Sequence, residues 1–134
     1  MQIPETIVTP EDPLLDDLAD RLAELATDLD RNDGWPAAQL RLCGERGVYR
    51  WFLPRTAGGL EWSDAEIARG YQKLSSGCLT TTFVITQYTG ASRRIASSDN
   101  ELLKTLLLPQ LLSGQIFATV GISHLTTSRR HLKE

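Results

Sequence analysis

Five leucines spaced three and four residues apart restrict the fold of this 134-residue chain more than any other feature. They fall on one stripe of an α-helix, and three alanines widen that stripe. The members of the stripe are Leu15, Leu18, Ala19, Leu22, Ala23, Leu25, Ala26 and Leu29. Because the stripe lasts for only about two heptads, packing inside a helical bundle explains it better than a coiled coil does.

Residues that favour helix ends place two helices in the first part of the chain. Thr9 and Pro10 predict the N-cap and the first helical position of the leucine helix, and the Asn-Asp-Gly run at 32–34 predicts its end. A second, shorter helix should open at Pro36 and stop at Gly47, because glycine readily takes the left-handed conformation that ends a helix.

Similar signals predict two further helices. Ser63 and Glu66 have the spacing of a capping box, which begins a helix that the Ser-Ser-Gly run at 75–77 ends. Ser98 or Asp99 should cap the last helix, and Pro109 should break or kink it near its end. The apolar face expected for this last helix consists of Leu102, Leu103, Leu106, Leu107 and Leu111.

Two other segments are less clear from their residues. Residues 80–86 are mostly β-branched, which favours a strand, but the uncharged stretch from Cys78 past Gly90 is far longer than a typical strand. A buried helix can also be neutral all round, so both interpretations stay open at this point. Residues 115–122 have the pattern of a strand, for which the chain offers no partner.

The composition excludes several classes of protein. Apolar residues make up 41% of the chain and charged residues 23%, as in a globular protein. A net charge of −3 argues against a dedicated nucleic-acid binder. Cys43 and Cys78 have no neighbouring ligands for a metal and are expected to be buried thiols. The uncharged stretch is too rich in threonine, serine and glutamine to cross a membrane, so a cytoplasmic protein is expected.

The order of these elements resembles the N-terminal half of the acyl-CoA dehydrogenases. The Gly-Gly turn at 56–60, the small-residue segment 75–78 and the Asp-Asn-Glu run at 99–101 are similar to segments of that family. The resemblance implies an all-α bundle, orthogonal or up-down, over residues 1–114. It implies the start of a middle β-domain, with a terminal β-strand, over residues 115–134. It also implies a helix rather than a strand for residues 78–91.

The resemblance implies a site as well. Thr82, Phe83 and Thr86 would line the pocket for the acyl chain of an acyl-CoA-like substrate. Val120, Ile122 and Ser123 would lead into the contacts with FAD. The catalytic base would come from a C-terminal domain beyond residue 134, so no acidic residue of this chain is assigned that role. Family members are usually homo-oligomers, and an electron-transfer partner is possible.

The last residues depart from the family pattern and leave alternatives open. His124 and Leu125 stand where Glu-Pro is usual, and residues 127–130 replace an Ala-Gly-Ser-Asp run. A flavin-dependent monooxygenase of the same superfamily is therefore a second hypothesis. A helical module that binds a partner or self-associates without catalysis is a third, because the unpaired strand could pair with another chain.

Overall fold

The computed structural model describes residues 5–120, and the chain is entirely helical there apart from turns and connecting segments. The expected all-α class is confirmed for this part of the chain. In chain order, the elements are α1 (Pro13–Asn32), α2 (Ala37–Glu45), the 3-10 helices η1 (Val48–Arg50) and η2 (Arg55–Ala57), α3 (Asp64–Gly77), α4 (Leu79–Ala96) and α5 (Glu101–Leu112).

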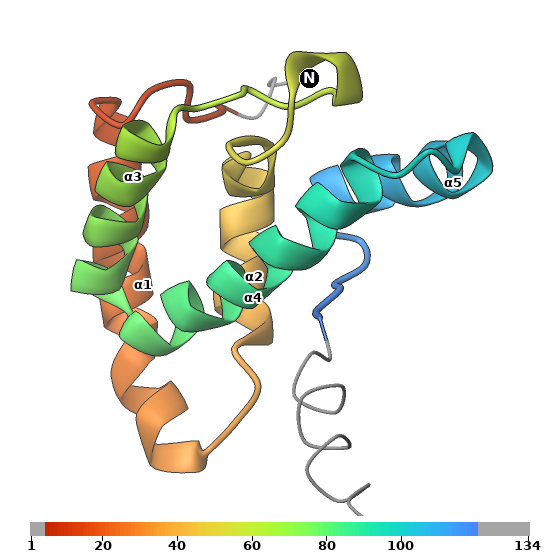
Figure 1. Cartoon of the computed structure of the whole chain (residues 1–134). Coiled ribbons are helices and arrows are strands. Elements are labelled where there is room, and N and C mark those ends of the chain that lie inside the picture. Colours follow the sequence, from red (N-terminus) through yellow and green to blue (C-terminus); the bar gives the residue numbers. More distant parts are fainter. Residues whose placement is uncertain (1–4, 121–134) are drawn as a thin grey trace, which may run out of the picture.

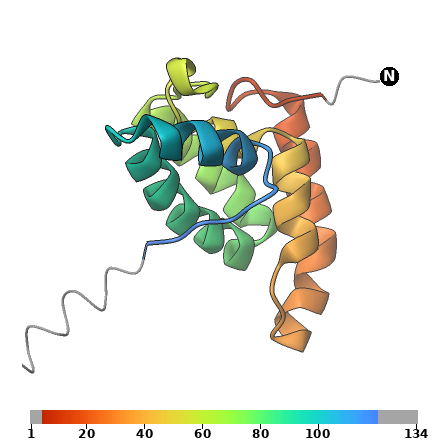
Figure 2. The ribbon, with the colours of Figure 1, turned by 90° about the vertical axis from the view of Figure 1, so that its right-hand side faces the viewer.

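The helices form an irregular bundle in which α4 takes a central position. Helix α1 packs most extensively against α3, and the two lie side by side in Figure 1. Helix α4 contacts α3, α5 and α2 and crosses the molecule diagonally in the same view. After α5 the chain turns back and passes across α4, as Figure 2 shows in blue.

The N-terminus of α1 lies three residues later than the sequence indicated. Asp12, not Thr9, is the N-cap, and its carboxylate accepts a hydrogen bond from the backbone N–H of Leu14 at 3.1 Å. Pro13 then occupies the first helical position, which suits a residue that lacks an N–H. The pattern of a cap followed by proline occurs twice, at 9–10 and at 12–13, and the second copy has the charged cap. The end is as expected, with Asp33 in the left-handed conformation.

The apolar run after α2 supplies the centre of the core. Val48, Trp51 and Leu53 are completely buried. The Trp51 ring stacks on that of Trp62, with ring centroids 4.2 Å apart. The indole N–H of Trp62 donates to the carbonyl of Val8 at 2.9 Å, which ties the chain before α1 to this cluster. The core is therefore built from aromatic side chains of the loops as well as from the leucine stripe of α1.

The structure shows the conformation of the segment whose residues left strand and helix both open. Residues 79–96 are helical, as the family resemblance implied and against the strand preference of the β-branched side chains. The hydroxyls of Thr82 and Thr89 donate to the carbonyls of Cys78 and Ile85, four residues earlier, at 2.9 and 3.0 Å. These bonds give the buried hydroxyls an acceptor within α4 itself, so burial outweighs intrinsic preference.

Helix α5 differs from expectation at its start and on its apolar face. Asn100 is the N-cap, because its side-chain oxygen accepts from the N–H of Leu103 at 3.0 Å, so neither Ser98 nor Asp99 fills that role. Leu108 and Leu111 point into the core, whereas Leu102 and Leu106 are exposed. Only one side of this leucine-rich helix faces the bundle, and the pattern of leucines does not reveal which side that is.

Two features near the end of the described chain differ from expectation. Pro109, which was expected to break or kink α5, does not break it, because the helix continues to Leu112. In a regular helix the N–H of residue 109 would donate to the carbonyl of Thr105. Proline has no N–H, but Thr105 is exposed, so water can donate to this carbonyl instead. Residues 115–120 of the expected strand at 115–122 form no strand, because no other described segment pairs with them. Residues 121 and 122 lie outside the described residues.

Candidate functional site

The three residues expected to line an acyl pocket lie in the first half of α4, and they differ in burial. Thr82 is buried, and Thr86 is partly exposed. Phe83 is 66% exposed, which is unusual for a phenylalanine on a helix that crosses the middle of a bundle. The hydroxyl of Thr86 donates to the carbonyl of Phe83 at 2.7 Å, so its oxygen remains able to accept a hydrogen bond from a ligand.

Val120, expected near a flavin, lies against the same helix. A Cβ atom placed on Gly90 would be 3.8 Å from Cγ2 of Val120. Phe83, Thr86 and Gly90 are three and seven residues apart, so they share one face of α4. The other two residues expected near the flavin, Ile122 and Ser123, lie outside the described residues. The structure therefore brings one flavin candidate onto the helix face that carries two of the pocket candidates.

Aromatic contacts hold the segment after α5 in this position. The ring of Phe117 packs against Tyr88 of α4, with centroids 5.1 Å apart, and edge-on against Trp35 at 5.6 Å. Tyr88 also donates from its hydroxyl to the carbonyl of Leu111, at the end of α5, at 2.7 Å. These contacts fix the direction in which the chain leaves α5 and so the position of Val120 beside Gly90.

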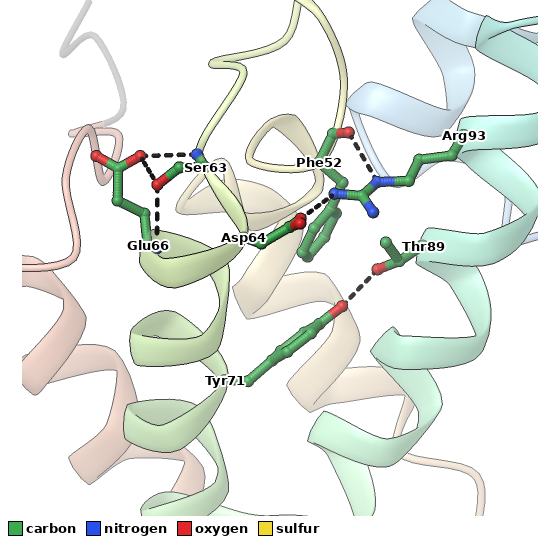
Figure 3. A network of polar contacts seen from close by, with 7 residues as sticks. All are labelled: Phe52, Ser63, Asp64, Glu66, Tyr71, Thr89 and Arg93. Atoms are coloured by element: carbon green, nitrogen blue, oxygen red, sulfur yellow. Dashed lines mark hydrogen bonds and ion pairs between the residues drawn. The ribbon is translucent and has the colours of Figure 1, made fainter.

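A polar network holds the neighbouring flank of α4 to the rest of the bundle (Figure 3). The hydroxyls of Tyr71 and Thr89 are 2.7 Å apart, which links α3 to α4. The Nε–H of Arg93 donates to the carbonyl of Phe52 at 3.3 Å, and its Nη2 lies 3.8 Å from the carboxylate of Asp64. Asp64 is almost fully exposed, so this ion pair contributes little to stability.

Sequence reasoning did not identify Tyr71, Thr89 and Arg93 as one group. They come from two helices and meet only through the fold, so no local motif marks them. The only sequence signal is the spacing of Thr82, Thr86, Thr89 and Arg93, which places them along one stripe of a helix. This stripe lies at the boundary between the exposed face of α4 and the contact with α3.

The capping box at the start of α3 is present as expected. The Ser63 hydroxyl accepts from the N–H of Glu66 at 3.3 Å, and the Glu66 carboxylate accepts from the N–H of Ser63 at 2.7 Å. A hydrogen bond from the Ser63 side chain and one from its backbone lower the pKa of Glu66. Glu66 is therefore occupied in capping the start of α3 and is not available as a catalytic base.

The two cysteines are buried thiols, as expected. Burial raises the pKa of Cys43 to about 12, so its reactive thiolate form is negligible at neutral pH. Within residues 5–120, no three histidine, cysteine, aspartate or glutamate side chains gather as metal ligands would. No helix in the same range is long and apolar enough to cross a membrane.

Comparison with known families identifies this arrangement. The family model for the acyl-CoA dehydrogenase N-terminal domain matches residues 15–115, about three quarters of the chain. The chain belongs to this family. The match runs from the leucine stripe of α1 through α5, so it includes all of α4. Comparison with curated proteins and with solved structures gave no match. Membership of the acyl-CoA dehydrogenase family agrees with the resemblance drawn from the residues.

Proposed function

We propose that this chain is the N-terminal part of an FAD-dependent oxidoreductase that removes hydrogen from the α- and β-carbons of acyl-CoA thioesters. One observation carries the proposal. Val120, the described residue expected nearest the flavin, lies on the same open face of α4 as Phe83 and Thr86. A substrate chain and a flavin have to lie side by side for hydrogen to pass between them, and this face offers adjacent positions for both.

In this proposal, FAD accepts the hydrogen taken from the substrate, and the chain supplies position and surroundings. Gly90 leaves room beside Val120, so a flat or narrow group can approach the backbone of α4 there. That open room fits the edge of a flavin, with Val120, Ile122 and Ser123 as the residues that hold it. Exposed Phe83 covers the acyl chain and excludes water, and Thr82 and Thr86 border the chain on the side toward α3.

The proposed chemistry also needs a base that removes the α-proton. Helix α4 has no acidic residue in its 18 positions, so its open face cannot supply this group. Asp64 pairs with Arg93, and Glu66 is part of the capping box. We therefore place the base outside this chain, in the C-terminal domain that the family resemblance implies. The 134 residues alone should bind but not turn over a substrate.

Two alternatives each have an observation in their favour. The altered residues at 124–130 favour a flavin-dependent monooxygenase of the same superfamily, which would take reduced flavin from an electron-transfer partner. The exposed leucines of α5, Leu102 and Leu106, favour self-association, either as part of a homo-oligomeric enzyme or as a non-catalytic helical module.

The test of the proposal is the visible absorption spectrum of the full-length protein, followed by titration with FAD. We expect a bound flavin, and we expect Val120→Asp to weaken FAD binding at least tenfold. Thr119→Asp is the matched control, because Thr119 is the exposed neighbour on the same segment. A full-length protein that neither carries nor binds FAD would overturn the proposal. Bleaching of the bound flavin by octanoyl-CoA without oxygen would separate the dehydrogenase from the monooxygenase.

A further inference from the structure

Helix α5 contains more leucine than a single buried face can use. Seven of its 12 residues are leucines, and its only two charged residues lie within its first four positions. Leu108 and Leu111 are buried against the bundle, whereas Leu102 is 79% exposed and Leu106 is 60% exposed. The helix lies at the outer edge of the bundle in Figure 1. It is therefore apolar on its solvent side as well as on its bundle side.

The exposed apolar side chains of α5 form a narrow seam. Leu102, Leu106 and Pro109 are exposed and follow one another at spacings of four and three residues. This alternation keeps the three on one line along the helix, and it is the spacing with which two helices pack side by side. The seam is about 10 Å long, because each of seven residues adds about 1.5 Å. A second helix no longer than α5 itself would cover it.

The two ends of the seam carry opposite charges. The exposed side chain of Glu101 lies at the N-terminal end of α5. At the other end, a Cβ on Gly58 would lie 3.1 Å from Cδ1 of Leu112, so η2 packs beside the C-terminal end of α5. Arg55 of η2 is exposed, and its ion pair with Glu61, at 4.0 Å, lies in solvent and contributes little. The seam therefore runs from an acidic end to a basic end.

We infer that this side of α5 is an interface with a second copy of the chain, in which the two α5 helices run antiparallel about a two-fold axis. Leu106 of one copy packs on Leu106 of the other at the axis, and Leu102 packs on Pro109. The antiparallel arrangement brings Glu101 of each copy to the end where the other copy carries Arg55. It also places opposite ends of the two helix dipoles together.

A second copy is the occupant because the seam is complementary to itself. After rotation by a half-turn the acidic end meets the basic end, as an isologous interface requires. A parallel pair would instead gather both Glu101 side chains at one end and both Arg55 side chains at the other. Lys104 contacts Oε1 of Glu101 at 2.7 Å, and the second oxygen of that carboxylate can accept from Arg55 of the other copy.

The dimer should be weak, because one short helix from each copy buries a small area. No residue of the open face of α4 takes part in it, so the inference does not depend on the function proposed above.

Sedimentation equilibrium of the 134-residue chain, from micromolar to millimolar concentrations, tests the interface. We expect a monomer–dimer equilibrium that Leu106→Lys weakens at least tenfold. Leu106 is exposed, so this variant should keep the circular dichroism spectrum of the wild type. Thr80→Lys is the matched control, because it adds the same charge to an exposed position of another helix and should change the dimer affinity less than twofold. A chain that stays monomeric, or a Leu106→Lys variant that dimerises like the wild type, would overturn the inference.

Charge reversal tests the contact between the ends of the two helices. Glu101→Arg and Arg55→Glu should each weaken the dimer, and the double variant should recover most of the affinity that either change loses. A double variant no better than the single variants would refute the charge pairing on which the choice of a second copy rests.

Cysteine cross-linking tests the orientation. Mild oxidation should link two copies of Leu106→Cys by a disulfide, because this position lies at the axis. Two copies of residue 102 would lie about 12 Å apart along an antiparallel pair, beyond the reach of about 7 Å between Cα atoms, so Leu102→Cys should not link. The native Cys43 and Cys78 are buried and should not compete. Equal cross-linking at both positions would indicate a parallel pair and overturn the antiparallel arrangement.

Discussion

The contact between Gly77 and α1 leads to a sharp prediction about stability. Gly77 is the last residue of α3, and a Cβ there would lie 2.2 Å from the carbonyl oxygen of Ala19 and 3.0 Å from its carbonyl carbon. Both atoms belong to the backbone of α1, so no side-chain rotation can relieve the contact. Substituting Gly77→Ala therefore has to separate α1 from α3, which form the most extensive helix pair of the bundle.

The size of the effect follows from the geometry. Nonbonded atoms prefer separations of about 3.5 Å, so the two helices must part by about 1 Å at this point. Overpacking of this kind costs about 1–3 kcal/mol. Alanine recovers part of that through its better helix propensity, at most about 1 kcal/mol and less at the end of a helix. We expect a net loss of about 1–2 kcal/mol, which lowers the melting temperature of a domain of this size by about 4–7 °C.

Urea unfolding followed by the helical circular dichroism signal measures this loss. The matched control is Gly90→Ala, the same substitution at a helical glycine where a Cβ would meet only an ordinary contact with Val120 at 3.8 Å, and it should gain about 0.5–1 kcal/mol. The double variant Ala19→Gly/Gly77→Ala should not be rescued, because the contact involves the carbonyl of Ala19 and not its side chain. A Gly77→Ala protein as stable as the wild type, or a rescued double variant, would refute the reasoning.

Two further predictions concern buried polar groups. Tyr88→Phe removes the hydrogen bond to the Leu111 carbonyl, which keeps a second donor in the N–H of Gly114, so urea unfolding should show a loss of about 1 kcal/mol. Wild-type stability in this variant would mean that the bond contributes nothing. Burial raises the pKa of Cys43 from 9.0 to about 12, so the folded protein keeps a proton that the unfolded chain releases. The free energy of unfolding should therefore not depend on this group below pH 9 and should fall as the pH rises from 9 toward 12. In Cys43→Ala, which lacks the thiol, the fall over the same pH range should be less steep. An identical pH dependence in the wild type and the variant would contradict this.

The parts of the fold that sequence predicted well depend on local chemistry. The capping box at Ser63 and Glu66 and the left-handed ends at Asp33 and Gly47 all form as expected, because the groups involved lie within a few residues of each other. The errors at the helix starts concern choices between equivalent local signals. Asp12 and not Thr9 is the N-cap of α1, although each of them is a capping residue followed by proline.

The apolar face of α5 shows a different limit. Leucines surround much of this helix, so the sequence indicates that it is apolar without showing which leucines are buried. The structure buries Leu108 and Leu111 and leaves Leu102 and Leu106 in solvent. That selection depends on how α5 sits against α4 and η1, which is information carried by the tertiary contacts and not by the spacing.

In the candidate site, too, the sequence indicated some features, and the tertiary structure alone shows others. Thr82, Phe83 and Thr86 were placed by the family resemblance, and the structure confirms only that they lie on a helix. Their role in binding an acyl chain stays a prediction. The link between α4 and Val120 depends on a turn after α5 and on the packing of Phe117, neither of which has a local signature. Gly90 carried no signal in the sequence and became informative only when its surroundings were known.

The absence of charge from residues 79–92 of α4 has a physical explanation that connects fold and site. Its buried hydroxyls bond to the helix backbone, so that side needs no charged partners. The open side of α4 needs no charged partners for folding either. An isolated α4 in water would be more stable with charged residues on that side. The chain instead exposes Leu79 and Phe83 at 70% and 66% on that side. Exposing two large apolar side chains on one face is unfavourable for a free surface, so the face is suited to being covered by another group. An acyl chain lying along α4 would cover it.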